Sequence, residues 1–229
     1  MALIRHGDYH QLPDVPSAHQ PFPLNPAGEA QAQQAVAAIR EMADHHGWRL
    51  LEPFHSSRML RAWQTARILA QGLADLFDAA PAIDSFDALA ERGLGCAANL
   101  SIEAIEQALE QDPRFDVPPE DWKANSHYRL PLQGAESLLQ AGERVAGHLQ
   151  RTLAALEGKV QQDSLLLCVG HGAAFRHAAY HLGVLTFEDI ARLSMYHASP
   201  VVLECRDNGR WCHVEGEWKV RQESSRELD

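Results

Sequence analysis

The sequence has few cysteines for its length. Four cysteines occur among 229 residues, and no two of them are spaced as Cys-x-x-Cys. So small a number argues against a disulfide scaffold and against a cysteine-ligated zinc site. It favours a reducing compartment, and we expect a cytoplasmic protein.

Basic side chains are scarce relative to acidic ones. The chain has 20 Lys and Arg against 31 Asp and Glu, a formal net charge of −11. Nucleic acids and anionic membrane surfaces bind clusters of Lys and Arg, so this balance argues against both as partners. A small anionic substrate stays compatible if the site itself concentrates positive charge.

Long apolar runs are missing as well. No stretch approaches the roughly 18 apolar residues of a membrane helix, and the first residues lack a secretory signal pattern. We therefore expect neither export nor membrane insertion. The hydrophobic share of 45% is nevertheless enough for a soluble globular protein with a substantial core.

The chain alternates strand-type runs with helical patterns. Residues 2–5 predict a very short first strand, and residues 164–170 are a continuous apolar run, typical of a strand covered on both faces. Residues 26–46 are the clearest helix, with Asn25 placed to cap it and Gly47 just past its end. Other expected elements are a short strand at 53–57, a helix after it capped by Ser56 or Ser57, a helix at 173–184, and a closing strand pair at 200–206 and 211–218.

This order predicts a three-layer α/β/α sandwich with a mainly parallel central sheet. We expect one domain over residues 1–229, because the length suits a single α/β unit. Residues 96–133 interrupt the alternation of strands and helices, and we interpret them as a helical insertion over the active-site end of the sheet. The polar residues 222–229 are expected to form a mobile tail.

Two histidines occupy equivalent places in this pattern. His6 ends the first strand within "IRHG", and His171 ends a later strand within "VGHG". Ligands of open α/β sheets bind beyond the carboxyl ends of the strands, so these two side chains can meet in one crevice. Arg5 lies beside His6, and Arg61 lies in the first turns of the helix after residue 57. Two guanidinium groups and two imidazoles around one point predict a phosphate site.

A neutral imidazole in such a site can attack phosphorus and form a phosphohistidine. His6 is the better candidate, with His171 as a hydrogen-bond donor to the phosphate, although the residues alone allow the roles to be reversed. The leaving oxygen needs a proton, and a nearby carboxyl group is the natural donor. Spacing alone does not decide between Glu91 and Glu136.

Six motifs in order resemble those of the histidine phosphatase superfamily, also called phosphoglycerate-mutase-like. They are "LIRHGD", "LNPAGEAQA", "SSRMLRAWQTA", "LAERGLG", "GAES" and "LCVGHGAAFR". The resemblance as a whole covers roughly residues 2–205. The resemblance implies a phosphohistidine enzyme that uses no metal and no cofactor.

The resemblance also implies a role for each matching residue. His6 becomes the nucleophile, Arg5, Arg61 and His171 form the rest of the phosphate pocket, and the backbone N–H of Gly172 is an additional donor to phosphate. Glu91 occupies the family's acid position and becomes the preferred proton donor.

We therefore expect a phosphoric monoester hydrolase that acts on a small phosphorylated metabolite. The alternatives are a phosphoglycerate-mutase-type phosphoryl transfer, a protein phosphohistidine phosphatase, and, outside enzymes, a module that binds a phosphorylated ligand. The chain departs from the mutase pattern at Gly93 and Leu94, where mutases carry histidine and tyrosine. The sequence does not identify the substrate or the oligomeric state.

Three further side chains are candidates for contact with the substrate. Gln11 follows the first motif and matches a polar position of the mutase loop, Arg58 lies one helical turn before Arg61, and Arg92 follows Glu91. We expect the aromatic residues of the insertion, such as Trp122, to anchor it rather than to line the substrate entrance.

Histidine pairs at metal-ligand spacing occur twice. His177 and His181 lie four residues apart, as do His6 and His10. Neither pair has the acidic or cysteine partner of a known metal motif, so we expect no metal site.

Overall fold

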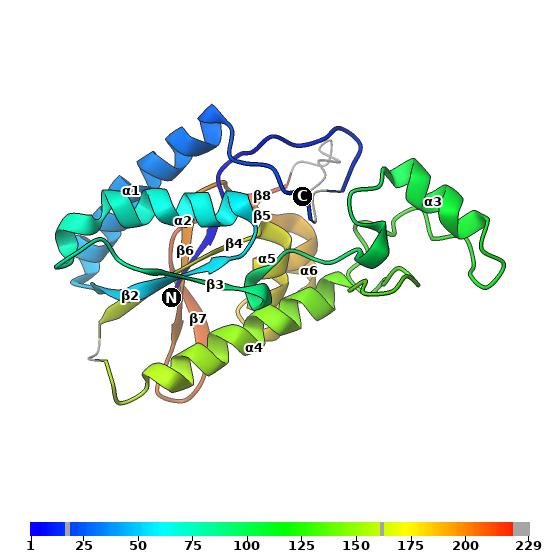
Figure 1. Ribbon diagram of the computed structural model, residues 1–229. Coiled ribbons are helices and arrows are strands. Elements are labelled where there is room, and N and C mark those ends of the chain that lie inside the picture. The colour runs from blue at the N-terminus through cyan, green and yellow to red at the C-terminus, as the bar shows by residue number, and fades with distance from the viewer. Residues whose placement is uncertain (17–18, 161–162, 222–229) are drawn as a thin grey trace.

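The structure of the protein is a computed structural model that describes residues 1–16, 19–160 and 163–221. Within these residues the central sheet has six strands in the order β3-β2-β4-β1-β6-β7 (Figure 1). They are β1 Ala2–Arg5, β2 Arg49–Ser57, β3 Ile83–Phe86, β4 Ser164–Gly170, β6 Pro200–Cys205 and β7 Trp211–Glu215. The tail expected at 222–229 lies outside the described residues.

The pairing confirms an α/β fold with a mainly parallel sheet. Strands β3, β2, β4 and β1 run parallel to one another, while β6 and β7 form an antiparallel edge. Strand β2 is longer than expected, because residues 49–51 pair with residues 164–166 before the register shifts. The expected closing pair of strands forms as β6 and β7. The second strand is shorter than expected, because β7 ends at Glu215 and Trp218 begins another strand, β8 Trp218–Val220.

Helices α1 Pro26–His46 and α2 Leu60–Gly72 cover one face of the sheet (Figure 1). Helix α1 begins as predicted, since the Asn25 side chain accepts a hydrogen bond from the Gly28 N–H, and it ends at Gly47 with a φ of 68°. The expected serine cap of α2 is wrong. Its N-cap residue is Met59, whose backbone N–H donates to the Ser57 hydroxyl at 3.3 Å.

Helices α4 Leu138–Leu156 and α5 Gly172–His181 cover the other face. Strand β1 shows the alternation that fills both cores: Ile4 belongs to the apolar cluster with α1 and α2, and Leu3 to the cluster with α4 and α5. Burial of both faces explains why β1 and β4 are continuous apolar runs.

The connection between β3 and α4 carries the insertion. It contains the short helices η2 Asp87–Leu89 and η3 Gly95–Ala97 and the helix α3 Ile102–Glu110, which projects beyond the sheet (Figure 1). A bridge between Leu94 and Ala135 closes its base. Trp122 lies fully buried in a separate apolar cluster of the insertion, and its indole N–H donates to Glu106 at 2.9 Å. The aromatic ring therefore holds the insertion together.

Four short elements complete the described chain. They are η1 Ala74–Leu76, α6 Phe187–Arg192, β5 Leu193–Met195 and β8 Trp218–Val220. Strands β5 and β8 pair as a separate two-stranded sheet. None of the helices in the described residues has the length and apolar character needed to cross a membrane.

Candidate active site

Two buried histidines meet at the carboxyl ends of neighbouring strands. His6 follows β1, His171 follows β4, and their ring centroids lie 5.1 Å apart. The backbone N–H of His6 donates to the Gly170 carbonyl at 3.0 Å, which continues the pairing of the two parallel strands past their ends. The sheet therefore fixes the positions of both imidazoles.

Arg61 lies between these imidazoles, in the first turn of α2. Its Nε donates to Nε2 of His6 at 3.0 Å, and its Nη2 lies 3.3 Å from Nδ1 of His171. A guanidinium group only donates hydrogen bonds, so both ring nitrogens must be acceptors. His6 then carries its proton on Nδ1 and donates it to the Gly7 carbonyl at 2.7 Å. His171 carries its proton on Nε2 and donates it to the Ser57 hydroxyl at 3.0 Å.

The surroundings keep both imidazoles neutral. Burial lowers the pKa of His6 well below its ordinary value, and the charge of Arg61, the electrostatic coupling to the His171 ring and the charge of Arg5 lower it further. Burial also lowers the pKa of His171, with Arg61 as the next cause. A neutral His6 with a lone pair on Nε2 is chemically a nucleophile.

Arg5 and the first turn of α5 supply further positive charge. The Arg5 Nη1 donates to the Met195 carbonyl at 3.1 Å, which ties the guanidinium to β5. A Cβ placed on Gly172 would lie 3.1 Å from Cδ of Arg5, so glycine lets this side chain pass close to the helix. Helix N-termini attract anions, and both Arg5 and Gly172 line the cavity.

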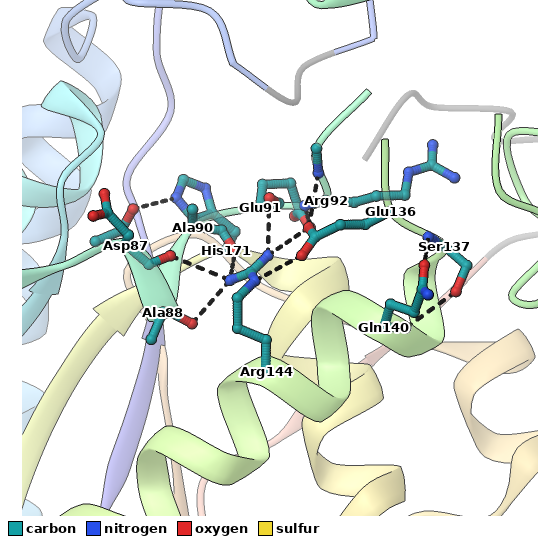
Figure 2. A network of polar contacts seen from close by, with 12 residues as sticks. Asp87, Ala88, Ala90, Glu91, Arg92, Glu136, Ser137, Gln140, Arg144 and His171 are labelled. Atoms are coloured by element: carbon teal, nitrogen blue, oxygen red, sulfur yellow. Dashed lines mark hydrogen bonds and ion pairs between the residues drawn. The ribbon is translucent and has the colours of Figure 1, made fainter. Parts of the chain in front are cut away.

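The two candidate acids have different environments. Glu91 is buried, lines the cavity and accepts hydrogen bonds from the backbone N–H groups of Arg92 at 2.9 Å and Ala173 at 3.3 Å. Figure 2 shows Glu136 paired with Arg144 instead, at 2.7 Å. Burial alone would raise the pKa of Glu136, but the hydrogen bonds from Arg144 and the Gly93 N–H outweigh it and lower that pKa. Glu136 is therefore held as a carboxylate.

A cavity of about 710 Å³ opens beside His6. Of the three expected substrate contacts, Gln11 lines it and the other two do not. Arg58 is largely exposed and pairs with Asp87 at 3.6 Å, and Arg92 is buried outside the cavity lining. The insertion at 96–133, which the structure describes in full, contributes no residue to the cavity wall.

Sequence reasoning missed several side chains that line this cavity. Tyr9 lies edge-on to His6, with Cζ of Arg61 4.5 Å from its ring centroid, and its place two residues after Gly7 is a signal that could have indicated it. His197 has its ring 5.8 Å from that of His6. Lys219 enters from β8. No local sequence pattern indicates His197 or Lys219, because the segments that carry them reach the cavity only through tertiary contacts such as the pairing of β5 with β8.

The histidine pairs at metal-ligand spacing have other partners. His177 contacts the Ala173 carbonyl at 2.7 Å and the Ser126 hydroxyl at 3.0 Å, and His181 lies 2.9 Å from the Leu139 carbonyl. Within the described ranges, no group of three or more His, Cys, Asp or Glu side chains is arranged to hold a metal ion.

Comparison with known proteins agrees with this geometry. Residues 1–217 match the family model described as histidine phosphatase superfamily (branch 1). The chain is 30% identical over 217 residues to a protein of Lactobacillus johnsonii named 2,3-bisphosphoglycerate-dependent phosphoglycerate mutase 2, covering 88% of this chain and 90% of that one.

Solved structures share the fold at lower identity. A mycobacterial glucosyl-3-phosphoglycerate phosphatase superposes with a TM-score of 0.69 at 19% identity, covering 96% of each chain. A phosphoserine phosphatase of Entamoeba histolytica, crystallised with 3-phosphoglyceric acid, gives a TM-score of 0.65 at 16% identity, covering 97% of this chain and 96% of that one.

Proposed function

The chain belongs to the histidine phosphatase superfamily, and on that premise we propose that it hydrolyses a small phosphorylated metabolite through a phosphohistidine on His6. The observation that carries the proposal is the neutral Nε2 of His6, which faces the Arg61 guanidinium at 3.0 Å. A lone pair beside buried cations is the arrangement that an attack on a phosphate ester requires.

In the first step, Nε2 of His6 attacks the phosphorus in line with the ester oxygen. The N–P bond forms as the P–O ester bond breaks, and Arg61 transfers its hydrogen bond from His6 to a phosphate oxygen. Arg5 and the N–H of Gly172 donate to the other phosphate oxygens, whose charge changes in the transition state. His171 joins them by turning its Nε2–H from the Ser57 hydroxyl to a phosphate oxygen. The carboxyl group of Glu91 gives its proton to the leaving oxygen and is left as a carboxylate.

In the second step, water releases the phosphate. The Glu91 carboxylate takes a proton from the attacking water, the new O–P bond forms, and the N–P bond to His6 breaks. Inorganic phosphate leaves, and both His6 and Glu91 return to their starting protonation states. The sum is one phosphomonoester and one water converted to an alcohol and inorganic phosphate.

Access of water supports hydrolysis over transfer to a second metabolite. A mutase must shield its phosphoenzyme from water, whereas the cavity rim here includes the exposed side chains of Gln11 and Tyr196. Gly93 and Leu94 also replace the residues that follow the acid in mutases. We propose a small-molecule substrate in the cytoplasm, with neither nucleic acid nor membrane as a partner.

The direct test is release of inorganic phosphate from an aryl phosphate and from a panel of phosphorylated metabolites. We expect the wild-type protein to be active with and without a chelator and His6→Ala to be inactive. His10→Ala is the matched control, because His10 is exposed and lies outside the cavity lining. Phosphoenzyme trapping should give an acid-labile, base-stable adduct that His6→Ala lacks.

Three results would contradict the proposal. Wild-type rates from His6→Ala would exclude the nucleophile. Interconversion of monophosphoglycerates with a bisphosphorylated primer, without net phosphate release, would identify a mutase. Measurable binding of phosphorylated ligands without any turnover would identify a binding module.

A further inference from the structure

Arg144 holds the chain segment that presents Glu91 to the cavity. From the first half of α4 its Nη1 donates to the backbone carbonyls of Asp87, Ala88 and Ala90 at 3.3, 2.9 and 3.1 Å. Its Nη2 lies 3.4 Å from the Glu91 carbonyl. Figure 2 shows the guanidinium group between these carbonyls and the Glu136 side chain. The Arg144 side chain thus fixes the backbone of the residues that lead up to Glu91.

Glu136 completes this arrangement from the opposite direction. Its Oε1 and Oε2 accept hydrogen bonds from Nε and Nη2 of Arg144 at 2.9 and 2.7 Å, and Oε2 also accepts the Gly93 N–H at 3.1 Å. The ion pair therefore holds the backbone on both sides of Glu91. Arg144 binds the carbonyls before it, and Glu136 binds the Gly93 N–H after it.

We propose that the Arg144–Glu136 pair positions Glu91 for proton transfer to the leaving oxygen without adding net charge beside it. The inference rests on the proposed function, in which Glu91 is the proton donor. Neither Arg144 nor Glu136 lines the cavity, so both act through Glu91 and are positioning residues.

The absence of net charge in the pair matters for the chemistry. An uncompensated cation near a carboxyl group favours its ionised form, which has no proton to donate. Glu136 cancels the charge of Arg144, so the hydrogen bonds remain while the electrostatic effect on Glu91 is reduced. Arg61 from α2, the adjacent Arg92, and His19 from the loop before α1 also interact electrostatically with Glu91.

Leaving-group dependence separates positioning of Glu91 from general structural damage. An alkyl phosphate needs a proton on its leaving oxygen, whereas 4-nitrophenyl phosphate releases a stable anion and needs almost none. We expect Arg144→Ala to lower kcat/KM on the order of 10- to 100-fold for the alkyl substrate, with a much smaller change for the aryl substrate. Arg144→Ala also removes a positive charge that acts on His171. This effect should change kcat/KM equally for both substrates, because both carry the same phosphate group.

Conservative variants test the two halves of the proposal. Arg144→Lys keeps the charge but replaces the fork of donors by a single ammonium group, so we expect only partial rescue of alkyl phosphate hydrolysis. Glu136→Gln leaves the Arg144 charge uncompensated, and we expect the alkaline limb of the alkyl phosphate pH profile to move to lower pH. Arg151→Ala, an exposed position on the same helix, is the matched control and should change neither substrate.

The deciding experiment is a double-mutant cycle with Glu91→Gln. If Arg144 acts through Glu91, Arg144→Ala should cost nothing further for the alkyl substrate once Glu91→Gln is present. Additive losses, or equal losses for both substrates in folded Arg144→Lys, would overturn the inference while leaving Glu91 as the donor. If Glu91→Gln itself shows no leaving-group dependence, the proposed proton donor is wrong and the inference fails with it.

Discussion

Arg61 donates a hydrogen bond from Nε to Nε2 of His6 across 3.0 Å. The guanidinium group therefore faces the position that a phosphorus atom must take when His6 attacks. In the proposed reaction the hydrogen bond that Arg61 now gives to His6 passes to a phosphate oxygen, while its contacts with His171 and the Gln20 carbonyl hold the guanidinium group in place. The same donors then orient both the nucleophile and the phosphate.

The first prediction follows from this shared use of Arg61. Arg61→Lys retains one positive charge but loses the fork that reaches both imidazoles, so we expect kcat/KM to fall by about 10²- to 10³-fold. Steady-state kinetics with an aryl phosphate and the affinity for vanadate would measure the effect. Arg67→Ala is a matched control, since Arg67 lies exposed on the same helix. Equal losses in the two variants would contradict the assignment.

The second prediction concerns the pH dependence of turnover. Because burial, the charge of Arg61, the electrostatic coupling to the His171 ring and the charge of Arg5 lower the pKa of His6 well below 6.5, the nucleophile stays unprotonated as the pH falls past that value. We expect kcat/KM, corrected for the titration of the free substrate, to show no loss with a midpoint near 6.5, because this parameter reports the ionisation of the free enzyme. A corrected fall in kcat/KM centred at an ordinary histidine pKa would show that the folded protein does not hold His6 neutral.

The third prediction concerns the pH dependence of stability. Burial and Arg176 lower the pKa of His177 to about 3, and burial and His55 lower the pKa of His148 to about 4. In the unfolded chain both groups titrate near 6.5, so below that pH the unfolded state binds more protons than the folded state. The free energy of unfolding should therefore fall from pH 6.5 towards pH 4, and continue to fall towards pH 3 through His177.

Denaturant unfolding at about pH 7.5 and about pH 5 measures this difference. His148→Gln should make stability less sensitive to pH over that interval, because it removes one of the groups that titrate. His213→Gln, an exposed position, should leave the pH dependence unchanged. A steeper dependence in His148→Gln would reverse the sign and reject the explanation.

The fourth prediction concerns the contact between α1 and the loop that follows His6. A Cβ added at Gly28 would overlap the carbonyl of Asp8, and one added at Gly7 would overlap the carbonyl of Gly28. Because backbone atoms cannot give way as a flexible side chain can, Gly28→Ala should destabilise the protein by roughly 1–3 kcal/mol and reduce activity.

The matched control for this contact is Gly147→Ala in α4. The atom nearest to a Cβ there is the end of the flexible Arg151 side chain, at 3.1 Å, and alanine is the better helix former. We expect this variant to be neutral or slightly more stable. A Gly28→Ala protein as stable and active as wild type would show that α1 and the loop can move apart without consequence.

Local chemistry made much of the fold predictable. Helix α1 carries its own start and stop in Asn25 and Gly47, and β4 is a run that both helical layers bury. The meeting of His6 and His171 followed from a general rule about the ends of parallel strands. Each of these inferences needs only neighbouring residues or a property shared by all open α/β sheets.

The details that were missed depend on contacts between distant segments. Spacing predicted that Arg58 and Arg61 share a helical face. Helix α2 begins only at Leu60, however, so Arg58 precedes the helix, pairs with Asp87 and stays outside the cavity. Glu136 resembled a possible acid until its pairing with Arg144 was visible. Lys219 reaches the cavity only because β8 pairs with β5. Periodicity within one segment contains no information about such partners.

The order of the strands sets when during synthesis this site can form. Strand β1 is made before β4 and β6, yet in the sheet it lies between these two later strands. His171 and the Met195 carbonyl, which complete the surroundings of His6 and Arg5, arrive equally late. Such distant pairings form slowly. During synthesis His6 is therefore present well before the residues that complete its site, and we expect no phosphatase activity from the nascent chain until β4, β5 and β6 have been made.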